Sequence, residues 1–66
     1  MPIYNQIKKM RTEKGVTQEQ LGEAVGVSRQ TIVAIEKGNY TPSLALAMSL
    51  ARFFKISVEE LFFMKK

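Results

Sequence analysis

The segment from Ser28 to Gly38 predicts a short helix with two different faces. Ser28 is a typical N-cap, because its hydroxyl can accept a hydrogen bond from an amide of the first turn, and Gly38 is typical of a helix end. Ile32 and Ile35 lie one turn apart and can face a core. The residues left to face something other than a core are Arg29, Gln30, Thr31, Val33, Ala34 and Lys37.

Two helices are predicted before this segment. A first helix runs through Lys14, and a second covers residues 18–25. Each begins at a residue whose side chain can cap it and ends before a glycine. The capping residues are Asn5 and Thr17, with Gln20 completing a capping box, and the glycines are Gly15 and Gly26. The expected inward face of the second helix consists of Leu21, Ala24 and Val25.

Two more helices are predicted after the third. Ser43 caps a helix from Leu44 to Phe54 that is apolar on nearly every side, which indicates burial all round. Ser57 caps a final helix over residues 58–62. The two ends of the chain alternate loosely between polar and apolar residues, so we expect them to pair as a small β-ribbon. The sequence therefore predicts an all-α domain of five helices over residues 1–66, with a ribbon formed by the ends.

Composition excludes several classes of protein. The chain has 66 residues and contains neither Cys nor His. It can therefore form no disulfide or zinc finger, and it can perform no thiol or imidazole chemistry. No apolar run approaches the roughly 20 residues of a membrane span, and the start of the sequence lacks the apolar core of a signal peptide. A cytoplasmic protein without a metal ion or cofactor is expected. No nucleophile–base pair or phosphate loop indicates an enzyme.

The second and third helices are joined by a tight turn through Gly26. This is the helix-turn-helix arrangement, in which the first helix lies across the DNA backbone and the second enters the major groove. Arg29 can pair with guanine O6 and N7, and Gln30 can pair with adenine N6 and N7. Val33 and Ala34 can contact a thymine methyl group. The polar front of the third helix is therefore predicted to face base edges.

The stretch "TQEQLGEAVGVSRQTIVAIEKGNYTPSL" resembles the Cro/lambda-repressor (XRE) type of helix-turn-helix domain. The matching elements are T-Q at the start of the second helix, G-V-S at the turn, I-x-x-I-E-x-G at the end of the third helix, P-S-L, and S-V-E-E-L-F. The resemblance extends from about Ile7 to Phe62. It implies a five-helix lambda-repressor-like fold with its motif at about residues 18–37, and binding of double-stranded DNA.

The resemblance also implies which residues bind DNA. Gln18 matches a glutamine that contacts phosphate, and Ala34 matches a position that faces bases. Lys37 matches a position that holds the DNA backbone, where contacts position the protein rather than specify the sequence. The predicted DNA-binding residues are Gln18, Ser28, Arg29, Gln30, Thr31, Val33, Ala34, Lys37, Asn39 and Tyr40.

Three further features follow from the comparison with the family pattern. Arg11 and Glu36 match a largely buried salt bridge that ties the first helix to the end of the third, a structural role. Gly22 stands where the family usually has Ala, which permits close packing against the third helix. Lys55 occupies a turn position that is usually Gly.

The fourth helix carries more apolar residues than one inward face needs. Leu44, Ala47, Met48, Ala51 and Phe54 supply that face, and a second stripe remains outside it. Exposed apolar patches usually mark an interaction site. The residues predicted for a dimer interface are Leu46, Leu50, Phe53, Phe63 and Met64.

These observations predict a homodimeric, sequence-specific regulator of transcription that represses from an inverted-repeat operator. The alternative is an antitoxin-like or accessory module whose apolar end binds a different protein, with DNA binding secondary. The state of association of the purified chain distinguishes the two.

Overall fold

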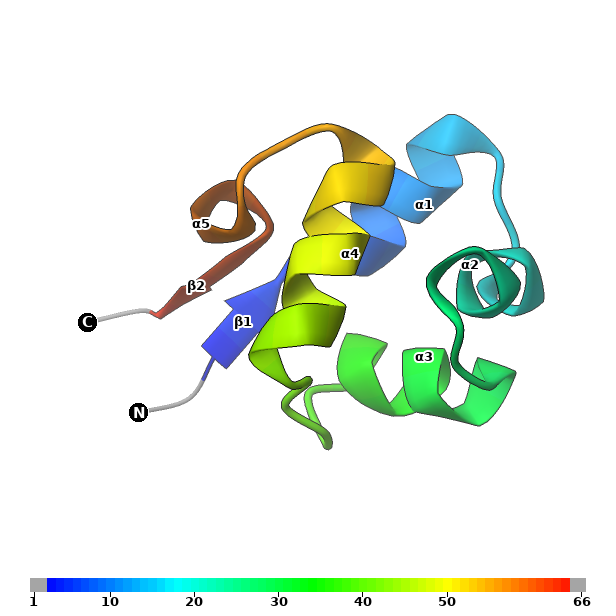
Figure 1. Cartoon of the computed structure of the whole chain (residues 1–66), viewed down its shortest axis with the longest axis horizontal. Coiled ribbons are helices and arrows are strands. Elements are labelled where there is room, and N and C mark those ends of the chain that lie inside the picture. Colours follow the sequence, from blue (N-terminus) through cyan, green and yellow to red (C-terminus); the bar gives the residue numbers. More distant parts are fainter. Residues whose placement is uncertain (1–2, 65–66) are drawn as a thin grey trace.

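The computed structural model describes residues 3–64 (Figure 1). It contains five helices and a two-stranded antiparallel sheet formed by the chain ends, as the sequence predicts. The elements in chain order are β1 (Ile3–Asn5), α1 (Ile7–Lys14), α2 (Gln18–Val25), α3 (Arg29–Glu36), α4 (Leu44–Phe54), α5 (Val58–Leu61) and β2 (Phe62–Met64).

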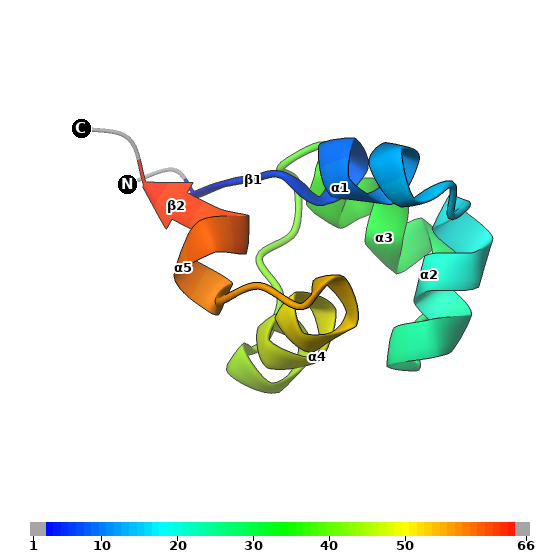
Figure 2. The same ribbon diagram turned by 90° about the horizontal axis from the view of Figure 1, so that it is seen from above.

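The helices surround a core to which all five contribute. Seen from above, α4 lies on one side of the molecule and α1 and α3 on the other (Figure 2). In both views, α2 lies at one end and the ribbon of β1 and β2 lies at the opposite end with α5. The largest fully buried side chains are Ile7, Leu21, Ile32, Ile35, Leu50 and Leu61.

Local capping signals set the helix starts. The hydroxyls predicted to cap α2, α3, α4 and α5 accept hydrogen bonds at 3.0–3.2 Å from backbone amides in the first turn, which confirms those caps. Both α2 and α5 have capping boxes, and the hydrogen bond from the backbone of Ser57 lowers the pKa of Glu60. The N-cap of α1 is Gln6 rather than the predicted Asn5, although Asn5 Oδ1 still accepts from Ile7 N at 3.1 Å.

The ends of two helices differ from expectation by one residue. α3 ends at Glu36, one residue earlier than expected, and α5 ends at Leu61. Phe62 leaves the helix because it pairs with Asn5 in the ribbon. Lys55 ends α4 in the left-handed conformation, at φ 60°. A residue other than Gly is strained there, which agrees with Gly being usual at this turn.

Helix α4 is not buried on all sides, so that prediction is wrong. Its buried residues are Ala47, Leu50, Ala51 and Phe54, a single stripe at helical spacing. Leu44 is 72% exposed and Met48 is 53% exposed, although both were expected to face inward. The residues of this stripe fill the contact between α4 and the core. Apolar side chains outside the stripe, such as Leu44 and Met48, are therefore exposed to solvent.

A similar correction applies to α2. Ala24 is exposed, and Gly22 is buried beside Leu21. A Cβ atom on Gly22 would lie 2.7 Å from the carbonyl oxygen of Val27. The close approach that this glycine permits is therefore to the turn before α3, rather than to α3 itself.

Candidate nucleic-acid interface

The connection between α2 and α3 fixes the two helices against each other. Gly26 adopts the left-handed conformation, and the Val27 amide then donates to the carbonyl oxygen of Gly22 at 2.8 Å. This bond folds the turn back onto α2, and Ser28 begins α3 directly after it. The short connection and the missing side chain at Gly22 thus set the crossing of the two helices.

Helix α3 has one buried face and one face open to solvent. Ile32 and Ile35 are buried in the core. Arg29, Gln30 and Lys37 are exposed, and three of the other residues predicted to face DNA are half-buried. The half-buried residues are Thr31, Val33 and Ala34. Because the two isoleucines fix the rotation of the helix, its first turn presents a long charged side chain and an amide to whatever approaches.

Residues at the starts of α2 and α3 line one hollow. This polar hollow is lined by Arg11, Thr17, Gln18, Glu19 and Arg29, so it brings together residues of α1, α2 and α3. Beyond the other end of α3, Asn39 and Tyr40 are exposed. The Asn39 amide donates to the carbonyl oxygen of Ala34 at 2.9 Å, which turns the chain away from the helix axis.

A hydrogen-bonded network holds the end of α3. Arg11 Nε donates to Glu36 Oε2 at 2.8 Å, and Arg11 Nη2 donates to Glu36 Oε1 at 3.3 Å. Arg11 Nη1 donates to the carbonyl oxygen of Val16 at 3.0 Å. The side chains of Arg11 and Glu36 are only 14% and 5% exposed. The pair therefore joins α1, the turn after it and the end of α3.

Gln18 belongs to the same network, which sequence reasoning missed. Its Nε2 donates to Glu36 Oε1 at 3.1 Å across 18 positions of the sequence. The bond uses one of the two hydrogens on Nε2, and the second can still donate to a phosphate oxygen. No local pattern signals this contact, because it depends on how α2 and α3 cross.

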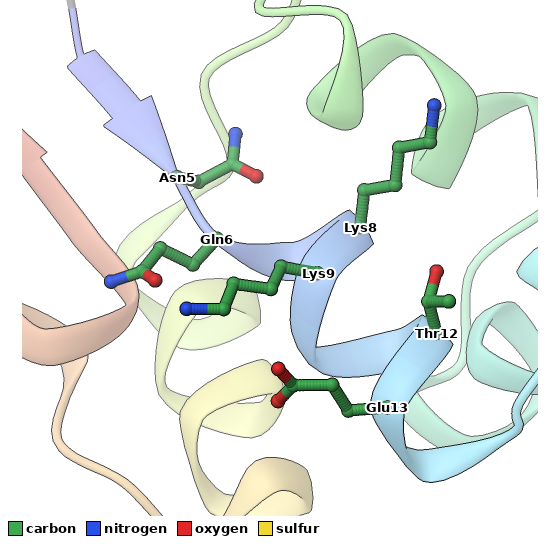
Figure 3. A pocket seen from close by; sticks show the side chains of 6 residues that line it. All are labelled: Asn5, Gln6, Lys8, Lys9, Thr12 and Glu13. Carbon is green, nitrogen blue, oxygen red and sulfur yellow. The ribbon is translucent and has the colours of Figure 1, made fainter.

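Lysines on the outer face of α1 point in different directions. They line a hollow with Asn5, Gln6, Thr12 and Glu13, in which Lys8 extends toward α3 and Lys9 extends toward Gln6 (Figure 3). Lys8 thus places positive charge on the side of α1 that faces α3.

In the part of the chain that the structure describes, no group of three His, Cys, Asp or Glu side chains could hold a metal ion.

The residues predicted for a dimer interface do not form one surface. Leu50 is fully buried in the core and has no surface to offer a partner, so the prediction that it lies at an interface is wrong. Leu46 and Phe53 are half-buried and pack against the core. Phe53 lines a hollow with Ala24 and Val25 of α2, and Lys14 Nζ lies 5.6 Å from its ring centroid.

Phe63 and Met64 lie at the other end of the molecule, in the ribbon (Figure 1). Both are exposed, as are Ile3 and Tyr4 on the paired strand. The rings of Tyr4 and Phe63 stack with their centroids 5.9 Å apart. We call these four residues, Ile3, Tyr4, Phe63 and Met64, the ribbon surface.

Comparison with known proteins relates this geometry to a family. A helix-turn-helix family model matches residues 7–61. The chain is 47% identical over 64 residues to the uncharacterized HTH-type transcriptional regulator YgzD of Bacillus subtilis, with 97% of each chain covered. It is 52% identical over 60 residues to the uncharacterized HTH-type transcriptional regulator MJ0272 of Methanocaldococcus jannaschii, with 91% of each chain covered.

A solved structure shares the fold. The P22 c2 repressor protein in complex with a synthetic operator matches with a TM-score of 0.79 at 26% identity, over 82% of both chains. This match confirms the predicted lambda-repressor-like fold. No helix in residues 3–64 is long and apolar enough to cross a membrane. The family match includes the whole of α2, the turn and α3, which carry the motif. The chain therefore belongs to the XRE/Cro-type helix-turn-helix family of DNA-binding transcriptional regulators, and it is not an enzyme.

Proposed function

We propose that this protein is a cytoplasmic transcriptional repressor that binds an inverted-repeat operator in double-stranded DNA as a homodimer. The observation that carries the proposal is the division of α3 into two faces. Buried Ile32 and Ile35 fix the rotation of the helix, and Arg29 and Gln30 are exposed on its first turn. The operator complex of the P22 c2 repressor, which has the same fold, supports the repressor role.

Specific readout is assigned to the exposed face of α3. Arg29 pairs with guanine O6 and N7, and Gln30 pairs with adenine N6 and N7, because these side chains match the paired groups of those bases in the major groove. Thr31, Val33 and Ala34 are half-buried and carry short side chains, so they contact bases only if the helix lies close to them. Their methyl groups suit thymine.

Contacts to phosphate are assigned to the residues on either side of this face. The hydroxyl of Ser28, the second hydrogen of Gln18 Nε2 and the ammonium of Lys37 are donors at the two ends of α3. Asn39 and Tyr40 are exposed just beyond Lys37. Contacts of this kind fix where the protein lies on the duplex and add affinity that falls with salt.

A dimer is proposed because one α3 helix reads only a few base pairs. A two-fold pair of helices placed about 34 Å apart enters successive major grooves on one face of B-DNA. The longest dimension of the molecule is 32 Å. Two copies that meet end to end can therefore hold their α3 helices at a distance comparable with that spacing. The end without α2 and α3 is the one that carries the ribbon (Figure 1).

The ribbon surface, which contains the predicted Phe63 and Met64 together with Ile3 and Tyr4, is proposed as the dimer contact. Met64, which is 62% exposed, pairs with Ile3 on one face of the ribbon, and the stacked rings of Tyr4 and Phe63 lie on the other face. Exposed apolar surface of this kind usually marks an interaction site. Leu44 and Met48 give α4 further exposed apolar area.

The same ribbon surface keeps the accessory-module alternative open, with a different protein as its partner. The mass of the purified full chain in solution decides between the two. A mass twice that of the chain at micromolar concentration supports the homodimer, whereas a monomer contradicts it and favours the alternative.

Selection of duplexes from a randomised pool tests DNA recognition directly. We expect the full chain to enrich an inverted repeat with half-site centres about 10 base pairs apart. Enrichment of an asymmetric site would contradict the dimer, and the absence of any enriched sequence would contradict specific readout. Transcription in vitro from a promoter that contains the selected site then tests repression.

A further inference from the structure

Asn5 lies where three parts of the fold meet. Its backbone pairs with Phe62 in the ribbon. Its side-chain Oδ1 accepts from the backbone amide of Ile7, at the start of α1, at 3.1 Å. Its Nδ2 donates to the backbone carbonyl of Ile35, near the end of α3, at 2.9 Å and across 30 positions of the sequence. The half-buried side chain therefore connects the ribbon to both helices.

The two partners fix the orientation of the amide. An N–H group requires the oxygen of the Asn5 side chain and a carbonyl requires its nitrogen, so a flipped amide would lose both bonds. Both partners are also backbone groups at helix ends, where intrahelical partners are missing. A single side chain thus bonds one group in the first turn of α1 and one in the last turn of α3, where the carbonyl of Ile35 also accepts from the Gly38 amide.

We propose that Asn5 is a positioning residue that couples the ribbon to α3, so that selective DNA binding depends on the ribbon being in place. The proposal rests on the proposed function for its readout. Two adjacent residues of α3 are tied to different elements, Glu36 to α1 and Ile35 to β1. Of these two links, the hydrogen bond from Asn5 joins α3 to the ribbon.

The position of this link explains why it affects recognition. Ile35 lies two residues before Lys37, for which a phosphate contact is proposed. Phosphate contacts fix the register of the protein on the duplex. Binding groups must be held to within about 0.5 Å of their productive geometry. A shift of the last turn of α3 would therefore weaken readout by its first turn, without unfolding the helix.

The neighbouring residue provides a matched control. Gln6 Nε2 donates to the backbone carbonyl of Glu60 at 3.2 Å, which is the same kind of bond to a different element. The two amides point apart, Asn5 toward the α3 side and Gln6 toward α5 (Figure 3). Asn5→Asp and Gln6→Glu each replace a donor by an oxygen and add one negative charge near the start of α1. Only Asn5→Asp breaks the link to α3.

The first measurement uses no DNA. In Asn5→Asp, the new oxygen faces the carbonyl of Ile35 and repels it, while the acceptor for Ile7 remains. We expect the NMR amide signal of Gly38, which donates to the same carbonyl at 3.0 Å, to shift in Asn5→Asp and to stay in place in Gln6→Glu. Equal effects of both variants, or an unchanged Gly38, would overturn the coupling.

The second measurement compares binding to the selected duplex with binding to a scrambled one, at a temperature where circular dichroism shows each variant folded. We expect the ratio of the two affinities to fall about tenfold in Asn5→Asp, or about 1.4 kcal/mol, and to stay within about twofold in Gln6→Glu. A residue that only stabilises the fold would leave this ratio unchanged. An unchanged ratio, or an equal fall in both variants, would therefore overturn the positioning role.

The measurements distinguish a failure of the Asn5 coupling from a failure of the proposed function. If the wild type itself does not discriminate between the duplexes, the proposed function fails, and the Gly38 signal still decides the coupling. If Asn5→Asp does not fold, Asn5→Ala removes both side-chain bonds without a charge and is compared with Gln6→Ala in the same two measurements.

Discussion

Gln18 and Glu36 join the start of α2 to the end of α3 through a hydrogen bond of 3.1 Å. The same carboxylate oxygen of Glu36 also accepts from Arg11 Nη2. Glu36 is therefore the shared acceptor for a cation and an amide on two different helices. Because its side chain is 5% exposed, these partners replace the water that would otherwise solvate the charge.

Replacement of Glu36 by Ala is expected to lower the free energy of unfolding by about 3 kcal/mol, because Arg11 would stay buried without its partner. The double variant with Arg11→Ala should cost less than the sum of the two single variants. Urea unfolding of the four proteins in this cycle measures the coupling. Strict additivity would mean that the ion pair contributes nothing to the fold.

Gln30→Ala is expected to weaken binding to the selected duplex by about 1–3 kcal/mol, because a paired contact to adenine is lost. Binding to a scrambled duplex should change little, since the side chain carries no charge. Titration of both duplexes by fluorescence anisotropy measures the difference. Wild-type discrimination in this variant would exclude a base contact by Gln30.

Lys37→Ala should lower affinity for every duplex and make the dependence of binding on salt shallower by about one ion, because one phosphate contact is lost. Lys9→Ala removes the same charge from the outer face of α1, where the side chain points toward Gln6 (Figure 3). Its salt slope should match that of the wild type. An equal change in the salt dependence of binding in both variants would contradict a phosphate contact by Lys37.

Met64→Glu and Phe53→Glu are expected to have different effects. Met64 is exposed on the ribbon surface, so a charge there should convert the dimer to a folded monomer whose melting temperature no longer depends on protein concentration. Phe53 packs against the core beneath Lys14, so a charge there should lower the melting temperature. Light scattering and thermal melting measure the two effects. A Met64→Glu protein that remains dimeric would place the interface elsewhere.

Lys55→Gly is expected to stabilise the protein by up to about 1 kcal/mol. Lys55 has φ 60°, which costs an L-residue roughly 1–2 kcal/mol, and the greater freedom of Gly in the unfolded chain offsets part of the gain. DNA affinity should not change. Chemical denaturation gives the difference, and a loss of stability would show that the Lys55 side chain makes a stabilising contact.

Some of the fold could be predicted because it depends on residues close together in the sequence. A hydroxyl that caps a helix bonds an amide three residues later, so Thr17, Ser28, Ser43 and Ser57 mark their helices without knowledge of the rest of the chain. The spacing of Ile32 and Ile35 likewise identifies the buried face of α3. The division of α3 into a core face and a polar face was therefore determined by the sequence.

Other features were decided only by tertiary structure. Spacing along α4 cannot tell which of several apolar sides meets the core, so the sequence predicts Leu50 at an interface and Leu44 inside, whereas Leu50 is buried and Leu44 is exposed. The bonds from Gln18 to Glu36 and from Asn5 to Ile35 join residues 18 and 30 positions apart. Such bonds form only when packing has brought helix ends and the ribbon together, because no local pattern encodes the crossing of distant elements.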